Sequence, residues 1–276
     1  MTEKLHTLPP PSRSKSGPLG KYLYCIIKDP EAKQACYGAG KKPKEFNVLG
    51  IDGGRVYSIS QGELSVVVSD AEIKEYPISR ENTLTHQKVI EEAMKEYDVL
   101  PISFGTVAES EKNIKEKILK LKAKELLNAL EKIKGKVELN LKAVWLDMSN
   151  VFREVLKENK EIQTAKKEAS TISGIGKTNL AMEVGKMVAN ALEEKKEREA
   201  REILEPFKKI AEDFKENKAQ LDQIIFNAAF LVSKEKEREF DEEVSKFGEK
   251  YDGRIKFLYV GPLPPFNFVK LEFSLK

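Results

Sequence analysis

Glycine-containing turns between short apolar runs are the feature that most constrains this fold. The runs are Phe46–Ile51, Arg55–Ile59 and Leu64–Val68. They are separated by Asp52-Gly53-Gly54 and by Gln61-Gly62. Glycine accepts the positive φ angles of tight hairpin turns, so such turns between apolar runs predict β-hairpins. The three runs therefore predict an antiparallel meander. The preceding run Lys21–Ile27, rich in aromatic and β-branched residues, predicts a further strand.

Two helices are expected after the meander. The first has an apolar stripe at helical spacing, made of His86, Val89, Ile90 and Ala93. Asn82 is placed to cap its N-terminus. The second is a long charged helix over Glu109–Lys134, with Ile and Leu on one face. Gly135 is expected to end it, because glycine accepts the left-handed conformation that follows many helices.

The second half of the chain alternates strands and helices. The expected elements are a strand at Lys136–Trp145, helices from about Asn150 to Asn217, strands at Gln223–Phe226 and Ala228–Ser233, a helix at Glu235–Lys250 and a strand at Arg254–Val260. Phe214 is assigned to the apolar face of the last crossover helix. This order of elements is that of a ferredoxin-like domain whose first crossover is enlarged by extra helix.

Both halves combine hairpins with helices, so the predicted fold class is α+β with two domains. Residues 1–20 form a Pro/Ser-rich tail that is expected to be disordered, because its composition cannot bury a core. Residues 21–134 are expected to form the N-terminal domain, a meander with helices. Residues 135–276 are expected to form the C-terminal, modified ferredoxin-like domain.

Charge and composition narrow the class of protein. The 276 residues include 48 Lys and Arg against 45 Asp and Glu, a net charge of +3. Nucleic-acid binding usually needs an excess of Lys and Arg on one face, so no nucleic-acid partner is expected. No apolar run is long enough to cross a bilayer, and no secretory signal is visible, so we expect a cytoplasmic protein without a membrane partner. Cys25 and Cys36 form no metal-ligand pattern, and buried free thiols are favoured over a disulfide or redox pair.

Gly174-Ile175-Gly176-Lys177-Thr178 has the ending of a phosphate-binding P-loop. That motif also requires a glycine where Thr171 stands, and a buried strand that leads into the loop. The preceding residues, Lys157–Ala169, are charged and helical in character. A flexible joint between two helices is therefore favoured. A nucleotide-dependent assembly factor using Gly174–Thr178 is the alternative.

The chain offers few residues for catalysis. Of its two histidines, His6 lies in the tail and His86 falls on the apolar helix stripe. A catalytic histidine needs a nucleophile or a carboxylate within hydrogen-bond reach, so a packed core role is favoured for His86. No catalytic triad, carboxylate pair, metal motif or cofactor motif stands out. The sequence predicts a protein that is not an enzyme and holds no cofactor or metal.

Three prolines and two aromatic rings follow the last predicted strand, within Gly261–Val269. Proline has no N–H to donate, so this segment is expected to leave the strand ladder as a stiff, extended turn. Packing of the segment is favoured over docking of a partner. Phe268 is predicted to pack into the C-terminal domain, where truncation of a buried ring costs about 3–5 kcal/mol. Phe266 is predicted to be the more exposed ring.

The same segment resembles the C-terminal signature Gly-Pro-x-Pro-Pro-Phe/Tyr-Asn/Ser-Phe-Val of the GvpF/GvpL family of gas vesicle proteins. The matching residues are Gly261, Pro262, Pro264, Pro265, Phe266 and Phe268. A stretch in the first half is similar to a second family element through His86, Pro101, Phe104 and Gly105. The Gly50–Gly53 turn also falls in the expected order, so the resemblance covers nearly all of the chain from residue 21 on. Leu263 departs from the pattern, because a tryptophan is common there.

The resemblance implies a role in building gas vesicles, the hollow, protein-shelled organelles that make microbes buoyant. It implies the small hydrophobic gas vesicle shell protein and other gas vesicle accessory proteins as partners, and a location in the cytoplasm and at the gas vesicle. Neither an enzymatic activity nor a cofactor goes with the family. The subtype, F or L, stays open, as do the oligomeric state and the role of the signature residues in packing or in partner contact.

Overall fold

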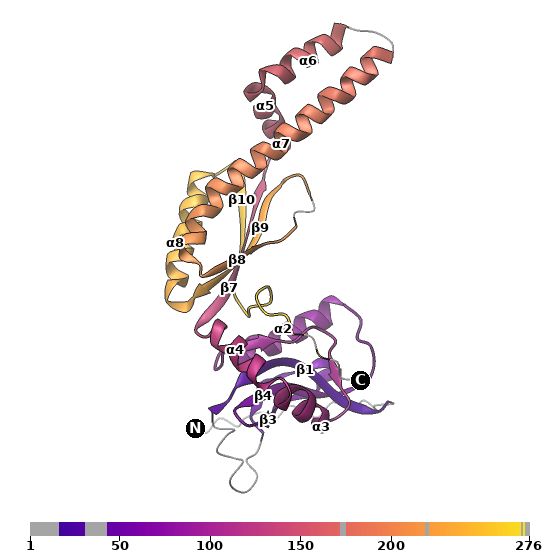
Figure 1. Ribbon diagram of the computed structural model, residues 1–276, viewed down its shortest axis with the longest axis vertical. Helices are drawn as coiled ribbons and strands as arrows, with labels where there is room; N and C mark the ends of the chain where they lie inside the picture. Colours follow the sequence, from indigo (N-terminus) through magenta and orange to yellow (C-terminus); the bar gives the residue numbers. More distant parts are fainter. Residues whose placement is uncertain (1–16, 31–42, 172–174, 219–220, 272, 274–276) are drawn as a thin grey trace, which may run out of the picture. The chain divides into compact units, whose positions relative to one another are not determined.

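The computed structural model describes residues 17–30, 43–171, 175–218, 221–271 and 273 (Figure 1). These residues form two compact units. Unit 1 combines the described residues up to Gly135 with those from Pro264 onward, and unit 2 comprises Lys136–Leu263. Each unit mixes helices with an antiparallel sheet, which confirms the predicted α+β class.

In the described part of the chain, unit 1 is built on a six-stranded sheet with antiparallel pairings throughout. Its strands are β1 (Leu19–Lys28), β2 (Glu45–Leu49), β3 (Arg55–Gln61), β4 (Leu64–Glu72), β5 (Val99–Pro101) and β6 (Val107–Ala108). The order is β2-β3-β4-β1-β5, and β6 also pairs with β1. The predicted meander is confirmed, because β2, β3 and β4 pair in succession. Gly53 and Gly62 in its turns have φ angles of 72° and 66°.

Strand β1 lies inside this sheet and is buried on both faces. Tyr22 and Tyr24 belong to one hydrophobic cluster, and Leu23 and Ile26 belong to the other. Cys25 lies on the same side as Tyr24, because a β-bulge shifts the register with β4 between Leu23 and Cys25. Both faces of β1 therefore contribute to a core. The Cys25 thiol is free and buried, as expected, whereas Cys36 lies outside the described residues.

Helical segments supply both cores of unit 1. Their bounds are α2 (Arg80–Met94), α3 (Glu111–Asn113), the π-helix η3 (Ile114–Lys120) and α4 (Ala123–Ile133). Val89 and Ile90 of α2 are buried in the cluster of Tyr22, whereas η3 and α4 bury their apolar residues in the cluster of Leu23. The sheet is therefore the middle of three layers.

The cap of α2 differs from the prediction. Ser79, not Asn82, is the capping residue, and its hydroxyl accepts a hydrogen bond from the Asn82 backbone N–H at 3.2 Å. The Asn82 side chain instead donates to the Pro77 carbonyl at 3.1 Å. Serine and asparagine cap equally well, so the local sequence did not distinguish them.

The single α-helix predicted over Glu109–Lys134 is also wrong. The segment is wound as a π-helix over Ile114–Lys120 and breaks at Lys122, where φ and ψ are −102° and 13°. The wider turn buries Ile118 and Leu119 together with Ile114. Burial of these side chains against the sheet outweighs the preference for a regular α-helix.

In the described residues, unit 2 contains a four-stranded antiparallel sheet. Its elements are β7 (Lys136–Trp145), α5 (Met148–Glu158), α6 (Lys160–Thr171), α7 (Ile175–Ile210), β8 (Asp213–Glu216), β9 (Ile224–Ser233), η4 (Lys234–Lys236), α8 (Glu237–Lys250) and β10 (Ile255–Leu263). The sheet order β10-β7-β9-β8 sets the fourth strand of the unit beside the first, followed by the third and the second. Helices α7 and α8 cover one face of this sheet, and α5 and α6 extend the crossover (Figure 1). The predicted ferredoxin-like order with an enlarged crossover is confirmed.

Two boundaries predicted in unit 2 are wrong. Phe214 lies in β8 rather than in a helix, and its ring stacks on Phe230 of β9 with 6.3 Å between centroids. The two strands predicted at Gln223–Phe226 and Ala228–Ser233 are the single strand β9. Asn227 interrupts the apolar run but pairs with Lys142 in the ladder, because successive strand residues point to opposite faces.

The prolines also do not end the last strand where predicted. Strand β10 continues through Gly261 and Pro262 to Leu263. The register with β7 shifts between Val260 and Leu263, and pairing resumes where Leu263 meets Glu138. A bulge accommodates the proline, which has no N–H for the ladder. The peptide bond between Gly261 and Pro262 is cis.

The two ends of the chain differ from the predicted domain boundaries. From Pro264 onward the chain belongs to unit 1, whereas 135–276 was expected to form one domain. Leu271 is buried in the cluster of η3 and α4, and Val269 packs against that cluster. At the other end β1 begins at Leu19, inside the predicted tail 1–20, of which residues 1–16 lie outside the described residues.

Gly50 lies beside a buried tyrosine hydroxyl. The Tyr24 hydroxyl accepts a hydrogen bond from the Ile51 N–H at 2.7 Å and is 2.8 Å from the Ser69 hydroxyl. A Cβ atom at position 50 would come within 2.2 Å of the Tyr24 hydroxyl oxygen. Only glycine leaves room for this hydrogen-bonded turn.

We expect Gly50→Ala to destabilise unit 1. The added methyl would displace the Tyr24 hydroxyl from its partners, at a cost of about 1–3 kcal/mol in free energy of unfolding. Gly17→Ala is the control, because a Cβ there would meet only the Glu72 side chain at an ordinary 3.9 Å. Urea denaturation followed by circular dichroism measures both variants. Equal stabilities of the two would contradict this account of Gly50.

Candidate functional site

The second family element, His86, Pro101, Phe104 and Gly105, is called the N-terminal signature below. Its two rings, His86 and Phe104, meet in an aromatic cluster of unit 1. The His86 ring, on α2, lies 5.5 Å from Tyr24, 5.7 Å from Tyr22 and 5.7 Å from Phe104 between ring centroids. Tyr22 also meets the edge of Tyr76 at 5.3 Å. Most of these contacts are edge-on or tilted, which are favourable geometries for aromatic pairs. Strand β1, helix α2 and the segment after β5 are thereby joined.

His86 is a buried, neutral side chain in this cluster. It is 5% exposed, and its Nε2 atom is 3.1 Å from the Ile102 carbonyl, to which a protonated Nε2 donates. Burial lowers the pKa of His86 to about 4, which the hydrogen bond to Ile102 only partly opposes. The Nδ1 atom is buried without a hydrogen-bond partner in the described residues. No nucleophile or carboxylate among those residues hydrogen-bonds the ring, so the geometry is that of a packed histidine.

Gly105 and Pro101 hold the backbone around Phe104. Gly105 has a φ angle of 82°, which favours glycine, and its N–H donates to the Tyr22 hydroxyl at 2.8 Å. Pro101 ends β5, where it pairs with Cys25. These contacts fix the segment that carries Phe104 against β1.

The first residues of the C-terminal signature lie in β10 of unit 2. Gly261 and Pro262 are exposed. A Cβ atom on Gly261 would come within 2.5 Å of the Leu139 side chain, so glycine allows the bulged strand to lie close to β7.

The rest of the signature forms a turn in unit 1. Pro264 and Pro265 are buried, and the Phe268 and Val269 N–H groups both donate to the Pro265 carbonyl at 3.1 Å. Phe266 is 36% exposed, whereas Phe268 is partly buried. The ring predicted to be more exposed is therefore the more exposed one. Phe268 belongs to unit 1 rather than to the C-terminal domain.

In unit 1 the two signatures pack with different hydrophobic clusters. His86 and Phe104 lie with the cluster that contains Tyr22, whereas Val269 packs against the cluster that contains Leu23. The structure thus brings the N-terminal signature residues together and leaves the C-terminal signature elsewhere. The signature residues do not converge on one cavity.

The sequence that ends in Gly-Lys-Thr does not form a P-loop cradle in the described residues. Gly176, Lys177 and Thr178 belong to the first turn of α7, which begins at Ile175. The element before them is helix α6, not a strand. Gly174 lies outside the described residues.

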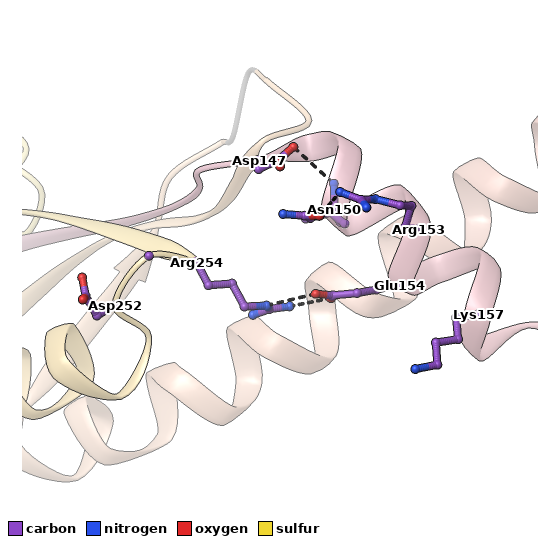
Figure 2. A pocket seen from close by; sticks show the side chains of 9 residues that line it. Asp147, Asn150, Arg153, Glu154, Lys157, Asp252 and Arg254 are labelled. Atoms are coloured by element: carbon purple, nitrogen blue, oxygen red, sulfur yellow. Dashed lines mark hydrogen bonds and ion pairs between the residues drawn. The ribbon is translucent and has the colours of Figure 1, made fainter.

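An ion-pair network in unit 2 was not anticipated from the sequence. Arg254 donates to Glu199 at 2.6 Å and to Glu154 at 2.9 Å, and Glu199 also accepts the Trp145 indole N–H at 2.8 Å. Lys195, with a side chain only 5% exposed, lies within 3.4 Å of both carboxylates. The network thereby joins the residue before β10 to α7, α5 and the end of β7. Figure 2 shows the pair that Arg254 forms with Glu154 of α5.

Beside this network lies an open pocket of about 440 Å³. Its charged lining residues are Asp147, Arg153, Glu154, Lys157, Asp252 and Arg254 (Figure 2). Acids and bases balance there, and Asp147 is already used to cap α5 by accepting from the Ser149 and Asn150 N–H groups. Hydrogen bonds from Arg254 hold the pKa of Glu154 below its usual range. Such paired charges indicate a structural network rather than a poised catalytic group.

The part of the chain that the structure describes lacks two further features. No group of three or more His, Cys, Asp or Glu side chains there is arranged to hold a metal ion. No helix in those residues has the length and hydropathy to span a bilayer.

Two solved structures share the fold of this chain. The fold is similar to the crystal structures of the gas vesicle protein GvpF from Anabaena sp. PCC7120 and from Microcystis aeruginosa, with TM-scores of 0.79 and 0.73. Sequence identity is 24% and 23%, over 92% and 91% of this chain and 99% of each of those chains. The two-unit architecture is thus one known among gas vesicle proteins.

Sequence comparison then gives the family. A family model described as "Gas vesicle synthesis protein GvpL/GvpF" matches residues 20–270, so the chain belongs to the GvpL/GvpF family. Gas vesicle protein F of Nostoc sp. is 26% identical over 92% of this chain and 99% of its own length. Gas vesicle protein F1 of Halobacterium salinarum is 28% identical over 83% of this chain and 88% of its own length.

His86 makes the stability of unit 1 depend on pH. Its pKa in the folded chain, about 4, lies below the ordinary value of 6.5, so the unfolded chain takes up a proton first as pH falls. The contribution of neutral His86 to the free energy of unfolding is therefore fully present above pH 6.5. It decreases as the pH falls towards 4, by roughly 3 kcal/mol for such a shift in pKa.

The variant His86→Gln should melt at a lower temperature at pH 7 because the aromatic packing is disturbed, and it should lack this component of the pH dependence. Melting curves of both proteins between pH 7 and pH 4.5 measure the difference. The carboxylates titrate in both proteins, so they cancel in the comparison. Parallel melting temperatures across the range would rule out a buried neutral His86.

We expect Glu199→Ala to destabilise unit 2 by about 2 kcal/mol, since it removes a partner of two cations and of the Trp145 indole. Glu154 and Glu158 still face Lys195, which keeps the loss below the 3–5 kcal/mol of a fully uncompensated buried charge. Trp145 is the only tryptophan, so its fluorescence during guanidinium denaturation reports on this unit. The exposed Glu194→Ala on the same helix is the control. A loss no larger than that of the control would show that the network contributes little.

Proposed function

We propose that this protein is an assembly factor or minor structural component of gas vesicles that binds the hydrophobic shell protein and other gas vesicle accessory proteins. The observation that supports this most is the family match over residues 20–270, which carries the description of gas vesicle synthesis. The similar curated proteins are gas vesicle proteins as well. Under this proposal the protein acts in the cytoplasm and at the gas vesicle.

A physical need for such a binder follows from the shell protein's character. A strongly apolar shell subunit must be kept from uncontrolled aggregation before it enters the growing wall. A partner in which 34% of residues are charged keeps a complex with such a subunit in solution. The antiparallel sheets of both units offer strand edges, and an extended segment of a partner binds to such an edge through backbone hydrogen bonds.

We infer that the protein acts through binding rather than through catalysis. Packing and backbone conformation account for the described signature residues His86, Gly105 and Gly261. In the unit 2 pocket Glu154 is paired with Arg254, and Asp147 caps α5. Neither set of contacts supplies an activated nucleophile.

The Gly174–Thr178 segment yields a direct test of the nucleotide-dependent alternative. Because Gly176–Thr178 is helical, Lys177→Ala should leave both thermal stability and vesicle formation nearly unchanged. Electron microscopy of cells that carry the variant gene counts vesicles, and a labelled ATP analogue tests binding at micromolar protein. Loss of vesicles with the fold intact, together with analogue binding by the wild-type chain, would favour the alternative.

Co-purification tests the proposal itself. We expect the tagged chain to retain the shell protein when the two are produced together with the other vesicle proteins, and to keep it in solution. An unrelated soluble protein with the same tag is the control. Samples taken before and after vesicle isolation distinguish an assembly factor, lost from finished vesicles, from a minor structural component. A chain that retains no vesicle protein in either sample would contradict the proposal.

A further inference from the structure

Strand β10 presents apolar side chains at an edge of the unit 2 sheet. It pairs with β7 on one side and ends the strand order on the other. Leu258 and Val260 are 41% and 55% exposed, on the face turned away from the helices. Phe257 and Tyr259, which alternate with them, pack against the helix-covered core. From Leu258 to Val260 the outward face of this strand is therefore apolar, where a soluble edge is usually charged.

The free edge of β10 also carries backbone hydrogen-bonding groups. The Leu146 N–H donates to the Arg254 carbonyl at 3.0 Å, and the register continues without a break from Ile255 to Val260. In an antiparallel pair the backbone N–H and C=O groups of successive residues point alternately towards and away from the paired strand. Because the Arg254 carbonyl points towards β7, the backbone groups of Leu258 and Val260 do so as well. Those of Phe257 and Tyr259 then point away from the sheet. No strand of the described residues pairs with this edge.

Other edges in the described residues are short, irregular or charged. Strand β8, at the opposite end of the same sheet, has four residues, of which Asp213, Lys215 and Glu216 are charged and exposed. In unit 1, β2 has its register interrupted between Phe46 and Leu49. These are the devices that protect an edge from other strands. The stretch from Phe257 to Val260 has none of them. Lys256 precedes it, and the bulge with Pro262 follows it.

The size of this edge fits an extended segment better than a second copy of the chain. Six strand residues span roughly 20 Å, so an added strand would cover roughly 200 Å² on each side. A stable dimer buries about 800 Å² per partner. Pairing with a second copy would also gather Lys142 and Lys256 of both copies on one face, since Lys142 lies opposite Leu258 and Lys256 is two residues before Leu258 on the same strand. The edge therefore suits a partner strand with apolar residues and no positive charge.

We propose that the edge of β10 is a docking site at which an extended apolar segment of the gas vesicle shell protein adds a fifth strand to the unit 2 sheet. This inference rests on the proposed function and assigns it a surface. The partner's backbone pairs with Phe257 and Tyr259, and its side chains cover Leu258 and Val260. An acidic side chain of the partner fits beside Lys256.

Substitutions on the exposed face test the site without touching the core. The variants Leu258→Lys and Val260→Lys keep the strand but place a charge where the partner's apolar side chains would lie. We expect each to lower retention of the co-produced shell protein at least about tenfold, as truncated interface anchors do. Leu146→Lys is the matched control, because Leu146 is a 54% exposed apolar residue of the same unit outside the strand. Circular dichroism tests whether all three variants fold.

Hydrogen exchange gives a second readout that reports on the backbone. Binding of the shell protein should slow exchange at the Phe257 and Tyr259 amides of the wild-type chain. Equal retention by wild type and both edge variants, with no added protection, would overturn the β10 site and leave the proposed function intact. Failure of the wild type to retain the shell protein would overturn both. A wild-type dimer that both edge variants convert to monomer would place a second copy on the edge and overturn the proposal as well.

Discussion

Strand β1 is buried on both faces, and unit 1 depends on finding partners for its backbone groups. A buried N–H or C=O without a partner costs about 1–3 kcal/mol, so neither edge of such a strand is left open. Strand β4 occupies one edge, while the short strands β5 and β6 occupy the other. Between them the Ile102 N–H donates to Tyr24 and the Leu23 N–H to Thr106. The second signature segment thus has a structural reason, because it completes the sheet around β1.

Steric contact explains the glycines of the signatures better than flexibility does. At Gly50 and Gly261 a Cβ would collide with Tyr24 and Leu139 respectively, and at Gly105 the φ angle itself favours glycine. Gly50 and Gly261 thus let the backbone approach another element closely. Close packing and backbone conformation thus account for these three glycines.

The sequence predicted those parts whose signals are local. The glycine turns gave the meander, and alternation gave β7 with its own bounds. The helix stripe placed His86 in the core, where it is found. Local signals could not reveal that η3 is π-wound or that the chain returns to unit 1 after Pro264, because burial against distant residues decides both. The network around Glu199 was missed for the same reason, since Glu154 and Arg254 are a hundred residues apart and abundant surface charge conceals them.

That network marks the place where the enlarged crossover is tied to the sheet. Trp145 ends β7, Arg254 precedes β10, and both donate to the one carboxylate of Glu199 on α7. Desolvation offsets much of the attraction between buried charges, so well-packed apolar residues would stabilise this junction as much or more. Apolar contacts, however, allow a helix to rotate or slide, whereas a guanidinium, an indole and a carboxylate fix both distance and direction. The charges therefore act mainly on specificity, holding α5 and α7 in one orientation on the sheet.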